Sequence, residues 1–123
     1  MNKEFVSYEI AFELKELGFD EPCFKYWVQT YNDTHTWMDL HNKALNDDDC
    51  KAPLYQQAFR WFREKYYRLA TIHLDWNGYS ISIHSTHLLT KGLICELRGY
   101  LTYEEAELAC IIKLIDIFKS KKD

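Results

Sequence analysis

Histidine and carboxylate side chains are the residues of this sequence whose types could support metal binding or acid–base chemistry. His73, His84 and Asp75 fall on one side of a β-hairpin predicted around the dipeptide Asn77-Gly78. Side chains on one face of adjacent strands are close enough to share an ion. A zinc site needs three or four ligands, however, and neither Cys-x-x-Cys nor His-Glu-x-x-His spacing occurs. We therefore predict no metal and no other cofactor, and interpret these side chains as the solvent face of a half-buried sheet.

Sequence motifs for catalysis are also absent. The chain has no Gly-x-Ser-x-Gly elbow, no phosphate-binding loop and no dinucleotide fingerprint, and it contains only 4 glycines. A Cys-His or carboxylate-pair site could still be assembled from distant residues, but no pattern nominates one. An enzyme is therefore disfavoured, and we predict no catalytic residue.

The stretch PLYQQAFRWFREKYYR, residues 53–68, combines aromatic and cationic side chains. As a nucleic-acid-binding helix it would use a basic strip to contact phosphates. On a helical wheel most of the aromatic residues fall on one apolar arc, and only Arg60 and Arg63 lie clearly on the water side. A net charge of −4 also argues against a general affinity for polyanions. Nucleic-acid binding is therefore kept as an alternative, with these candidate residues: Arg60, Arg63, Lys65 and Arg68.

Three helices are predicted to organise the chain. The first covers residues 8–17 and follows Ser7, a residue type that caps helix N-termini. The second covers 54–68 after Pro53, since proline suits the first helical turn. The third begins at a capping box formed by Thr102 and Glu105 and continues to about residue 118.

The strands are predicted from alternation and turn residues. Two strands are expected in residues 23–40 around a turn at Asn32-Asp33, followed by a polar connection over 42–52. The clearest local signal is Asn77-Gly78, the preferred pair for a two-residue type I′ hairpin turn. A further strand is expected over 92–101. The predicted hairpin register pairs Trp76 with Tyr79, Leu74 with Ile81, Ile72 with Ile83 and Ala70 with Ser85.

These elements predict an α+β fold in the order α-β-β-α-β-β-β-α. Three helices would cover a mainly antiparallel sheet of four to five strands. The 123 residues, 47% of them hydrophobic, favour a single domain over 1–123 with a disordered C-terminal tail from about 119. The N-terminus lacks a signal-peptide pattern, the longest apolar run is too short to span a bilayer, and the 4 cysteines form no close pair. We predict a cytoplasmic protein without membrane association.

Surplus apolar surface is the main indication of a binding function. The third helix is apolar on nearly all sides, so its second face either lies centrally in the core or meets a partner. The hairpin within 23–40 also carries large apolar side chains on both faces. The candidate interface residues are Trp27, Met38, Leu108, Ile111 and Ile115.

Three blocks of the sequence carry a resemblance to a known family. They are SYEIAFELKELGFDEPCF, APLYQQAFRWFREKYY and TYEEAELACIIKLIDI, at residues 7–24, 52–67 and 102–117. They resemble a family of small uncharacterised proteins of gut Bacteroides-type bacteria and their phages, crAss-like phages included. The resemblance implies origin in a phage or other mobile element and a location in the bacterial cytoplasm, and it brings no assigned activity.

The sequence therefore favours a non-enzymatic accessory protein that acts by binding a protein partner or by forming a homodimer. Nucleic-acid binding through the 54–68 helix is one alternative. A small-ligand binder or small enzyme of the phage–host conflict is another, and it would require a pocket lined by tyrosine and tryptophan with convergent polar groups.

Overall fold

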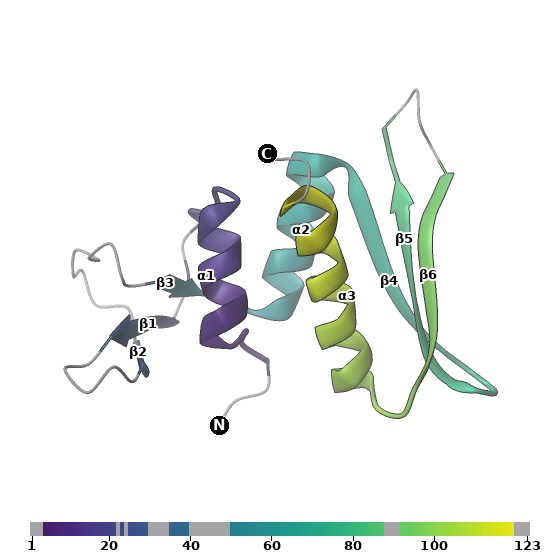
Figure 1. Cartoon of the computed structure of the whole chain (residues 1–123), viewed down its shortest axis with the longest axis horizontal. Helices are drawn as coiled ribbons and strands as arrows, with labels where there is room; N and C mark the ends of the chain where they lie inside the picture. The colour runs from purple at the N-terminus through teal and green to yellow at the C-terminus, as the bar shows by residue number, and fades with distance from the viewer. Residues whose placement is uncertain are drawn as a thin grey trace. The chain divides into compact units, whose positions relative to one another are not determined.

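The computed structural model describes residues 4–21, 23, 25–29, 35–39, 50–87 and 92–119, with backbone only at 26, 28, 29 and 35–39. The chain divides into two compact units, Met1–Tyr55 and Gln56–Asp123, which are described in turn (Figure 1). The expectation that residues 1–123 behave as one domain stays a prediction. The expected tail falls almost wholly on residues 120–123, which lie outside the described ranges.

The first unit begins with helix α1, Tyr8–Glu16. Ser7 caps its N-terminus, because the Ser7 hydroxyl accepts a hydrogen bond from the backbone N–H of Ile10 at 3.5 Å. Gly18 follows the helix with φ +99°, the left-handed conformation that ends many helices. The apolar stripe is buried at Ile10, Ala11 and Leu14. The helix predicted over 8–17 is confirmed to within one residue.

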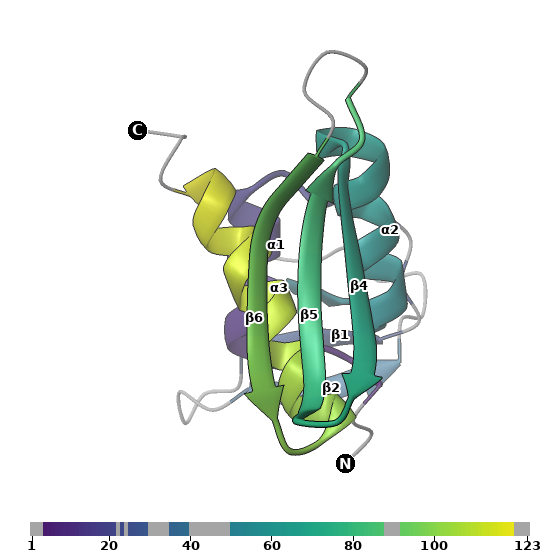
Figure 2. The same cartoon turned by 90° about the vertical axis from the view of Figure 1, so that its right-hand side faces the viewer.

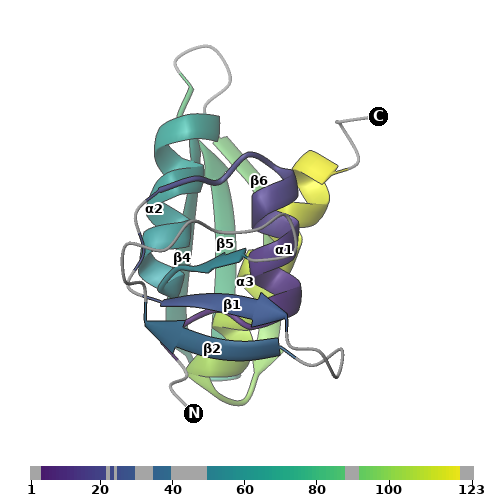
Figure 3. The same cartoon turned by 90° about the vertical axis from the view of Figure 1, so that its left-hand side faces the viewer.

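A three-stranded antiparallel sheet completes the first unit. It consists of β1 (Lys25–Gln29), β2 (His35–Asp39) and β3 (Cys50–Ala52), in the order β2-β1-β3. Figure 3 shows β1 and β2 side by side, which confirms the predicted hairpin, although its turn at Asn32-Asp33 lies outside the described residues. Strand β3 falls in the segment predicted as a polar connection. It forms because its backbone pairs with β1, while the side chains of Cys50 and Ala52, 1% and 0% exposed, are buried.

The second unit has two helices and three strands. Helix α2 (Tyr55–Tyr66) leads into β4 (Arg68–Asp75), β5 (Gly78–Ser85) and β6 (Gly92–Tyr100), and α3 (Tyr103–Lys119) follows. The strands form an antiparallel sheet in the order β4-β5-β6, with β5 in the centre. Figures 1 and 2 show α2 and α3 on the same face of this sheet. Within the described residues, the opposite face of the sheet carries no helix of this unit.

The core of the second unit lies between the helices and the sheet. Ile81 and Ile83 of β5 are 0% exposed, as are Phe62 of α2 and Leu114 of α3. Phe118 stacks against α2, with its ring centroid 4.1 Å from that of Tyr66 and 6.0 Å from that of Phe62. Most aromatic residues of the stretch 53–68 therefore serve the packing of the molecule, as the helical wheel predicted.

The register of the β4-β5 hairpin differs from the prediction by two residues. Asp75 pairs with Gly78, so Trp76 and Asn77 form the turn and Trp76 does not pair with Tyr79. The side chain of Asp75 explains the shift, because its Oδ1 accepts a hydrogen bond from the backbone N–H of Asn77 at 2.9 Å and closes the turn locally. The shift is even, so each residue keeps its face of the sheet. The observed pairs are Leu74 with Tyr79, Ile72 with Ile81, Ala70 with Ile83 and Arg68 with Ser85.

The α+β class, the three helices and the antiparallel pairing are confirmed, and the predicted order of elements recurs with β3 added. The predicted sheet of four to five strands is wrong. Among the described residues the strands form two sheets of three. The hairpin within 23–40 pairs with β3 of its own unit instead of joining the β4-β5-β6 sheet, a long-range choice that alternation cannot reveal.

Candidate functional site

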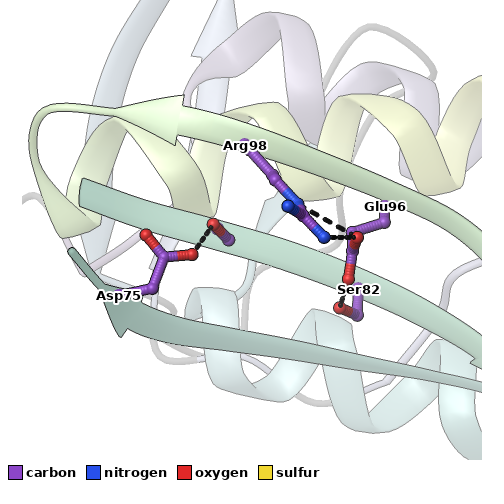
Figure 4. A network of polar contacts seen from close by, with 5 residues as sticks. Asp75, Ser82, Glu96 and Arg98 are labelled. Atoms are coloured by element: carbon purple, nitrogen blue, oxygen red, sulfur yellow. Dashed lines mark hydrogen bonds and ion pairs between the residues drawn. The ribbon is translucent and has the colours of Figure 1, made fainter. Parts of the chain in front are cut away.

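The helix-free face of the β4-β5-β6 sheet carries a network of polar side chains (Figure 4). The Ser80 hydroxyl donates to Asp75 Oδ2 at 2.8 Å, and the Ser82 hydroxyl donates to Glu96 Oε2 at 3.5 Å. Arg98 donates to the other oxygen of Glu96 through Nε at 3.1 Å and also through Nη2. The hydrogen bond from Ser80 is the main reason why the pKa of Asp75 lies below its usual value. Arg98 lowers the pKa of Glu96 in the same way.

This network does not assemble a metal site. His73 lies opposite Ser80, whereas His84 lies opposite Leu69, four positions further along β5. At about 3.3 Å per residue, four positions correspond to roughly 13 Å, too far for one ion to bind both imidazoles. Within the described ranges, no three His, Cys, Asp or Glu side chains cluster so as to hold a metal ion. The Glu96 carboxylate is paired with Arg98, and the Asp75 carboxylate accepts from Ser80 and from the backbone N–H of Asn77.

Three large apolar side chains stand in water at one end of the same sheet. Leu74 is 67% exposed, Trp76 is 93% exposed and Leu101 is 83% exposed. Trp76 lies in the β4-β5 turn and Leu101 in the connection from β6 to α3, and Figure 2 shows these two turns at the same end of the sheet. We call Leu74, Trp76 and Leu101 the apolar end. Single exposed apolar residues are common on protein surfaces, whereas grouped exposed apolar residues are characteristic of interaction surfaces.

The backbone holds the apolar end in a fixed conformation. Gly78 has φ +117°, and a Cβ at this position would lie 2.6 Å from the backbone oxygen of Tyr100. Tyr100 pairs with Tyr79, which places the two turns next to each other. On the other side, Leu101 donates its backbone N–H to Glu105 Oε2 at 3.3 Å. The two turns are therefore tied to each other and to the start of α3.

Carboxylates border the apolar end. Asp75 precedes the β4-β5 turn and accepts a hydrogen bond from within it. Glu104 and Glu105 lie in the first helical turn of α3. The Thr102 hydroxyl accepts a hydrogen bond from the backbone N–H of Glu105 at 3.1 Å, which is one half of the predicted capping box. The Glu105 carboxylate accepts from the backbone N–H of Leu101 instead of that of Thr102. The lowered pKa of Asp75, caused mainly by Ser80, keeps that carboxylate ionised at neutral pH. The border of the apolar end is consequently negative.

The interface residues predicted from the sequence lie in different environments. Ile111 and Ile115 of α3 are 0% and 3% exposed, whereas Leu108 is 41% exposed. Trp27 of β1 is half-buried in the first unit, where its Nε1 donates to the backbone oxygen of Val6 at 3.2 Å and its ring meets that of Tyr8 edge-on. The side chain of Met38 lies outside the described residues. Of the three candidates on α3, only Leu108 is exposed.

The basic strip predicted on α2 also separates into distinct roles. Lys65 places its Nζ 5.5 Å from the ring centroid of Trp61. Arg68 donates to the backbone oxygens of Tyr66 and Tyr67 at 3.1 Å and 3.3 Å, and so caps the C-terminus of α2. Its guanidinium also lies over the ring of Phe118 at 5.4 Å. Arg60, Arg63 and Lys65 are exposed, whereas Arg68 is half-buried.

Arg60 and Arg63 border a cavity of about 280 Å³ in the second unit. Residues 69–72 of β4 form one wall of the cavity, and Tyr103 lies at its border. Gln56 on α2 donates from its side-chain nitrogen to the Tyr103 hydroxyl at 3.5 Å. Burial is the main reason why the pKa of Tyr103 is raised, so this hydroxyl stays protonated at neutral pH. The α2 residues that line the cavity are Gln56, Phe59, Arg60 and Arg63.

Sequence reasoning missed the apolar end and the cavity for different reasons. The predicted register places Trp76 and Leu74 on the face of the hairpin opposite His73 and Asp75. The signal that could have moved Trp76 into the turn is Asp75, a residue type that closes turns through its side chain. The exposure of Leu101 depends on where α3 starts. Gln56 and Tyr103 are separated by 47 positions in the chain, and no sequence pattern brings them together.

Comparison with known proteins finds no matching family model, no matching curated protein and no matching solved structure. The resemblance carried by the blocks at 7–24, 52–67 and 102–117 therefore stays a prediction. Across the part of the chain that the structure describes, no helix is both long enough and apolar enough to cross a bilayer.

Proposed function

We propose that this chain is a non-enzymatic accessory protein of a phage or other mobile element that acts by binding another protein through its apolar end. The observation that supports this proposal is the joint exposure of Leu74, Trp76 and Leu101 on two adjoining turns. Tryptophan is enriched among residues that dominate binding energy, because a large rigid side chain buries much area at small entropic cost. The resemblance to small phage and Bacteroides-type proteins supports the proposed origin.

The charges around the apolar end define the chemistry of the partner. Asp75, Glu104 and Glu105 favour a partner whose apolar cleft is bordered by lysine or arginine. The same carboxylates would face one another if two copies met through this end, and like charges across an interface are costly. They would also be repelled by an anionic lipid surface. A basic protein surface with an apolar cleft is therefore the proposed partner.

A library of short displayed peptides tests this proposal without a known partner. Peptides are selected on the wild-type chain, and the enriched sequences are then titrated against wild type and against Trp76→Ser and Leu101→Ser. We expect the enriched peptides to carry apolar side chains flanked by lysine or arginine. Each substitution should weaken their binding about tenfold or more, since an exposed anchor residue is lost.

Leu93→Ser is the matched control, because Leu93 is also exposed but lies near the start of β6, seven residues before Tyr100. It should leave peptide binding unchanged. Equal binding to wild type, Trp76→Ser and Leu101→Ser would contradict the proposal. A dimer detected by light scattering and abolished by Trp76→Ser would instead identify self-association as the use of this surface, and would overturn the proposed basic partner.

A further inference from the structure

The cavity beside α2 is lined by both apolar side chains and polar groups. Phe59 of α2 and Leu69 and Ile72 of β4 are half-buried around it. β4 is an edge strand of its sheet, so the cavity lies where the sheet has no further described strand. With about 280 Å³, it falls near the small end of the range for ligand pockets, which suits one ring and its substituents.

Hydrogen-bond donors dominate the polar border of this cavity. Arg60 and Arg63 each bring a guanidinium, one helical turn apart on the same face of α2. Guanidinium groups bind carboxylates and phosphates with two parallel hydrogen bonds. Tyr103 adds a hydroxyl that stays protonated, and the Gln56 side chain holds this hydroxyl from the α2 side. Glu107 lies near enough to Tyr103 to raise its pKa, but it belongs to the buried face of α3 and does not line the cavity.

We propose that this cavity binds a small organic anion, in which a carboxylate or phosphate group is carried on a flat apolar body. The oxyanion contacts Arg63, Arg60 and the Tyr103 hydroxyl, and the apolar body lies against Phe59 and Ile72. Nucleic acid fits this surface less well, because phosphate backbones need an extended basic track and Lys65 and Arg68 lie on other contacts. This inference is independent of the protein partner proposed for the apolar end.

Titration of the isotope-labelled full chain by NMR tests the site with four defined probes. Phenyl phosphate and benzoate carry both an oxyanion and a ring, inorganic phosphate lacks the ring, and benzamidine carries a cation. We expect one or both aromatic anions to shift the amide signals of α2 and β4, and to bind about tenfold more tightly than inorganic phosphate, because the ring buries apolar surface. The stronger of the two aromatic anions identifies the preferred oxyanion.

Variants then connect the binding to the named groups. Arg63→Gln should weaken the aromatic anion about tenfold, since a charge-assisted hydrogen bond is lost, and Tyr103→Phe should weaken it by a smaller factor. Lys113→Gln removes the same charge from the surface of α3, ten residues beyond Tyr103 and so about 15 Å along the helix, and should have no effect. Arg63 is exposed, so its substitution leaves the fold intact.

Three results would overturn the proposal. The first is equal binding of benzamidine and the aromatic anions. The second is equal loss of affinity in Arg63→Gln and Lys113→Gln, which would indicate attraction by net charge alone. The third is the absence of any shift in α2 and β4 at millimolar probe concentration.

Discussion

The apolar end and the second face of α3 are two apolar regions of the same unit, and their roles are the reverse of what hydrophobicity alone predicts. Leu108, Ile111 and Ile115 on α3 looked like a surface in excess of what one core needs, yet the last two are 0% and 3% exposed. Trp76 was assigned to the packed face of a hairpin, yet it is 93% exposed. Hydrophobicity thus reports that a side chain can be buried, while the position of turns and helix ends decides whether it is.

The apolar end and α3 are subject to different physical constraints on burial. A helix that is apolar on nearly all sides must be covered, because uncovered apolar area raises the free energy of the folded state in proportion to its size. A turn residue has no such requirement, since local hydrogen bonds such as the one from Asn77 to Asp75 define its conformation. Exposed apolar residues on a locally stabilised turn are therefore available for binding in a way that the residues of α3 are not.

The largest expected effect is a difference between the two regions in how much a substitution lowers the free energy of unfolding. Ile111→Ala should lower the free energy of unfolding by about 3 kcal/mol, because it leaves a cavity at a fully buried position. Trp76→Ala should change it by at most about 0.5 kcal/mol, because the ring is in water in the folded state. Urea unfolding monitored by circular dichroism measures both changes.

Leu108→Ala is the control for this pair, since it truncates an α3 residue that is 41% exposed and should give an intermediate loss. A loss for Trp76→Ala as large as that for Ile111→Ala would show that the apolar end is packed in solution. The contrast between the two regions would then be wrong.

The second prediction concerns the backbone that holds the apolar end. Gly78→Ala should destabilise the fold by about 2 to 3 kcal/mol, because it adds a Cβ 2.6 Å from the oxygen of Tyr100 at a φ of +117°. Gly99→Ala is the matched control. Gly99 also has positive φ, +88°, but a Cβ there meets nothing within 4 Å, so the cost should be about 1 kcal/mol of backbone strain.

Equal losses for Gly78→Ala and Gly99→Ala would mean that the close approach of the two turns is absent in solution. The apolar end would then be two independent loops. Thermal unfolding of both variants, with amide chemical shifts of Leu101 as a local readout, distinguishes these outcomes.

Local sequence signals predicted the elements well, because they act over a few residues. Ser7 caps α1 and Thr102 caps α3, as their positions indicated, whereas the Glu105 carboxylate accepts from Leu101 instead of Thr102. The face assignment of the β4-β5 hairpin is also correct, because it depends only on alternation. The predicted register is wrong because Asp75 closes the turn around Trp76-Asn77, one residue before the predicted pair Asn77-Gly78.

Long-range features could not be predicted in the same way. Strand β3 has three residues and exists because it pairs with β1, where Cys50 lies opposite Trp27, 23 positions earlier in the chain. The separation into two three-stranded sheets likewise depends on which strands meet. The cavity requires Tyr103 to lie beside α2, and the apolar end requires Gly78 to lie against Tyr100. Each of these features depends on a contact between residues that are distant in the chain, and the types of those residues do not indicate that they meet.

The third prediction compares the two regions by thiol chemistry. Cys110 lies on α3 and is 0% exposed, and burial raises the pKa of its thiol to about 12. Because the thiolate is the reactive form, Cys110 should react with a thiol reagent at pH 8 only as the protein opens. Trp76→Cys places a thiol at the apolar end, where it should react as fast as in the unfolded chain. Mass spectrometry of timed samples assigns each modified residue, and rapid labelling of native Cys110 would contradict the covered position of α3.

The smallest expected effect is the pH dependence of the turn at Asp75. The hydrogen bond from Ser80, followed by that from Asn77, lowers the pKa of Asp75 in the folded state below its unfolded value of about 3.9. The unfolded chain therefore binds more protons in this range, so the stabilisation is complete above about pH 5 and is lost as the pH falls through the folded pKa. Asp75→Asn keeps an acceptor for the N–H of Asn77 but cannot ionise, so its melting temperature should approach that of wild type as the solution is acidified from pH 5.

Glu96→Gln provides the comparison within the same sheet, because Arg98 lowers the pKa of Glu96 on the polar face, away from the turns. Both substitutions should flatten the acid side of the stability profile, for the same linkage reason. Only Asp75→Asn should also change the chemical shifts of Trp76 and Leu101, because only Asp75 accepts a hydrogen bond within the β4-β5 turn. If Glu96→Gln shifts these signals equally, the conformation of the apolar end depends on the polar network of the whole sheet and not on its own turn.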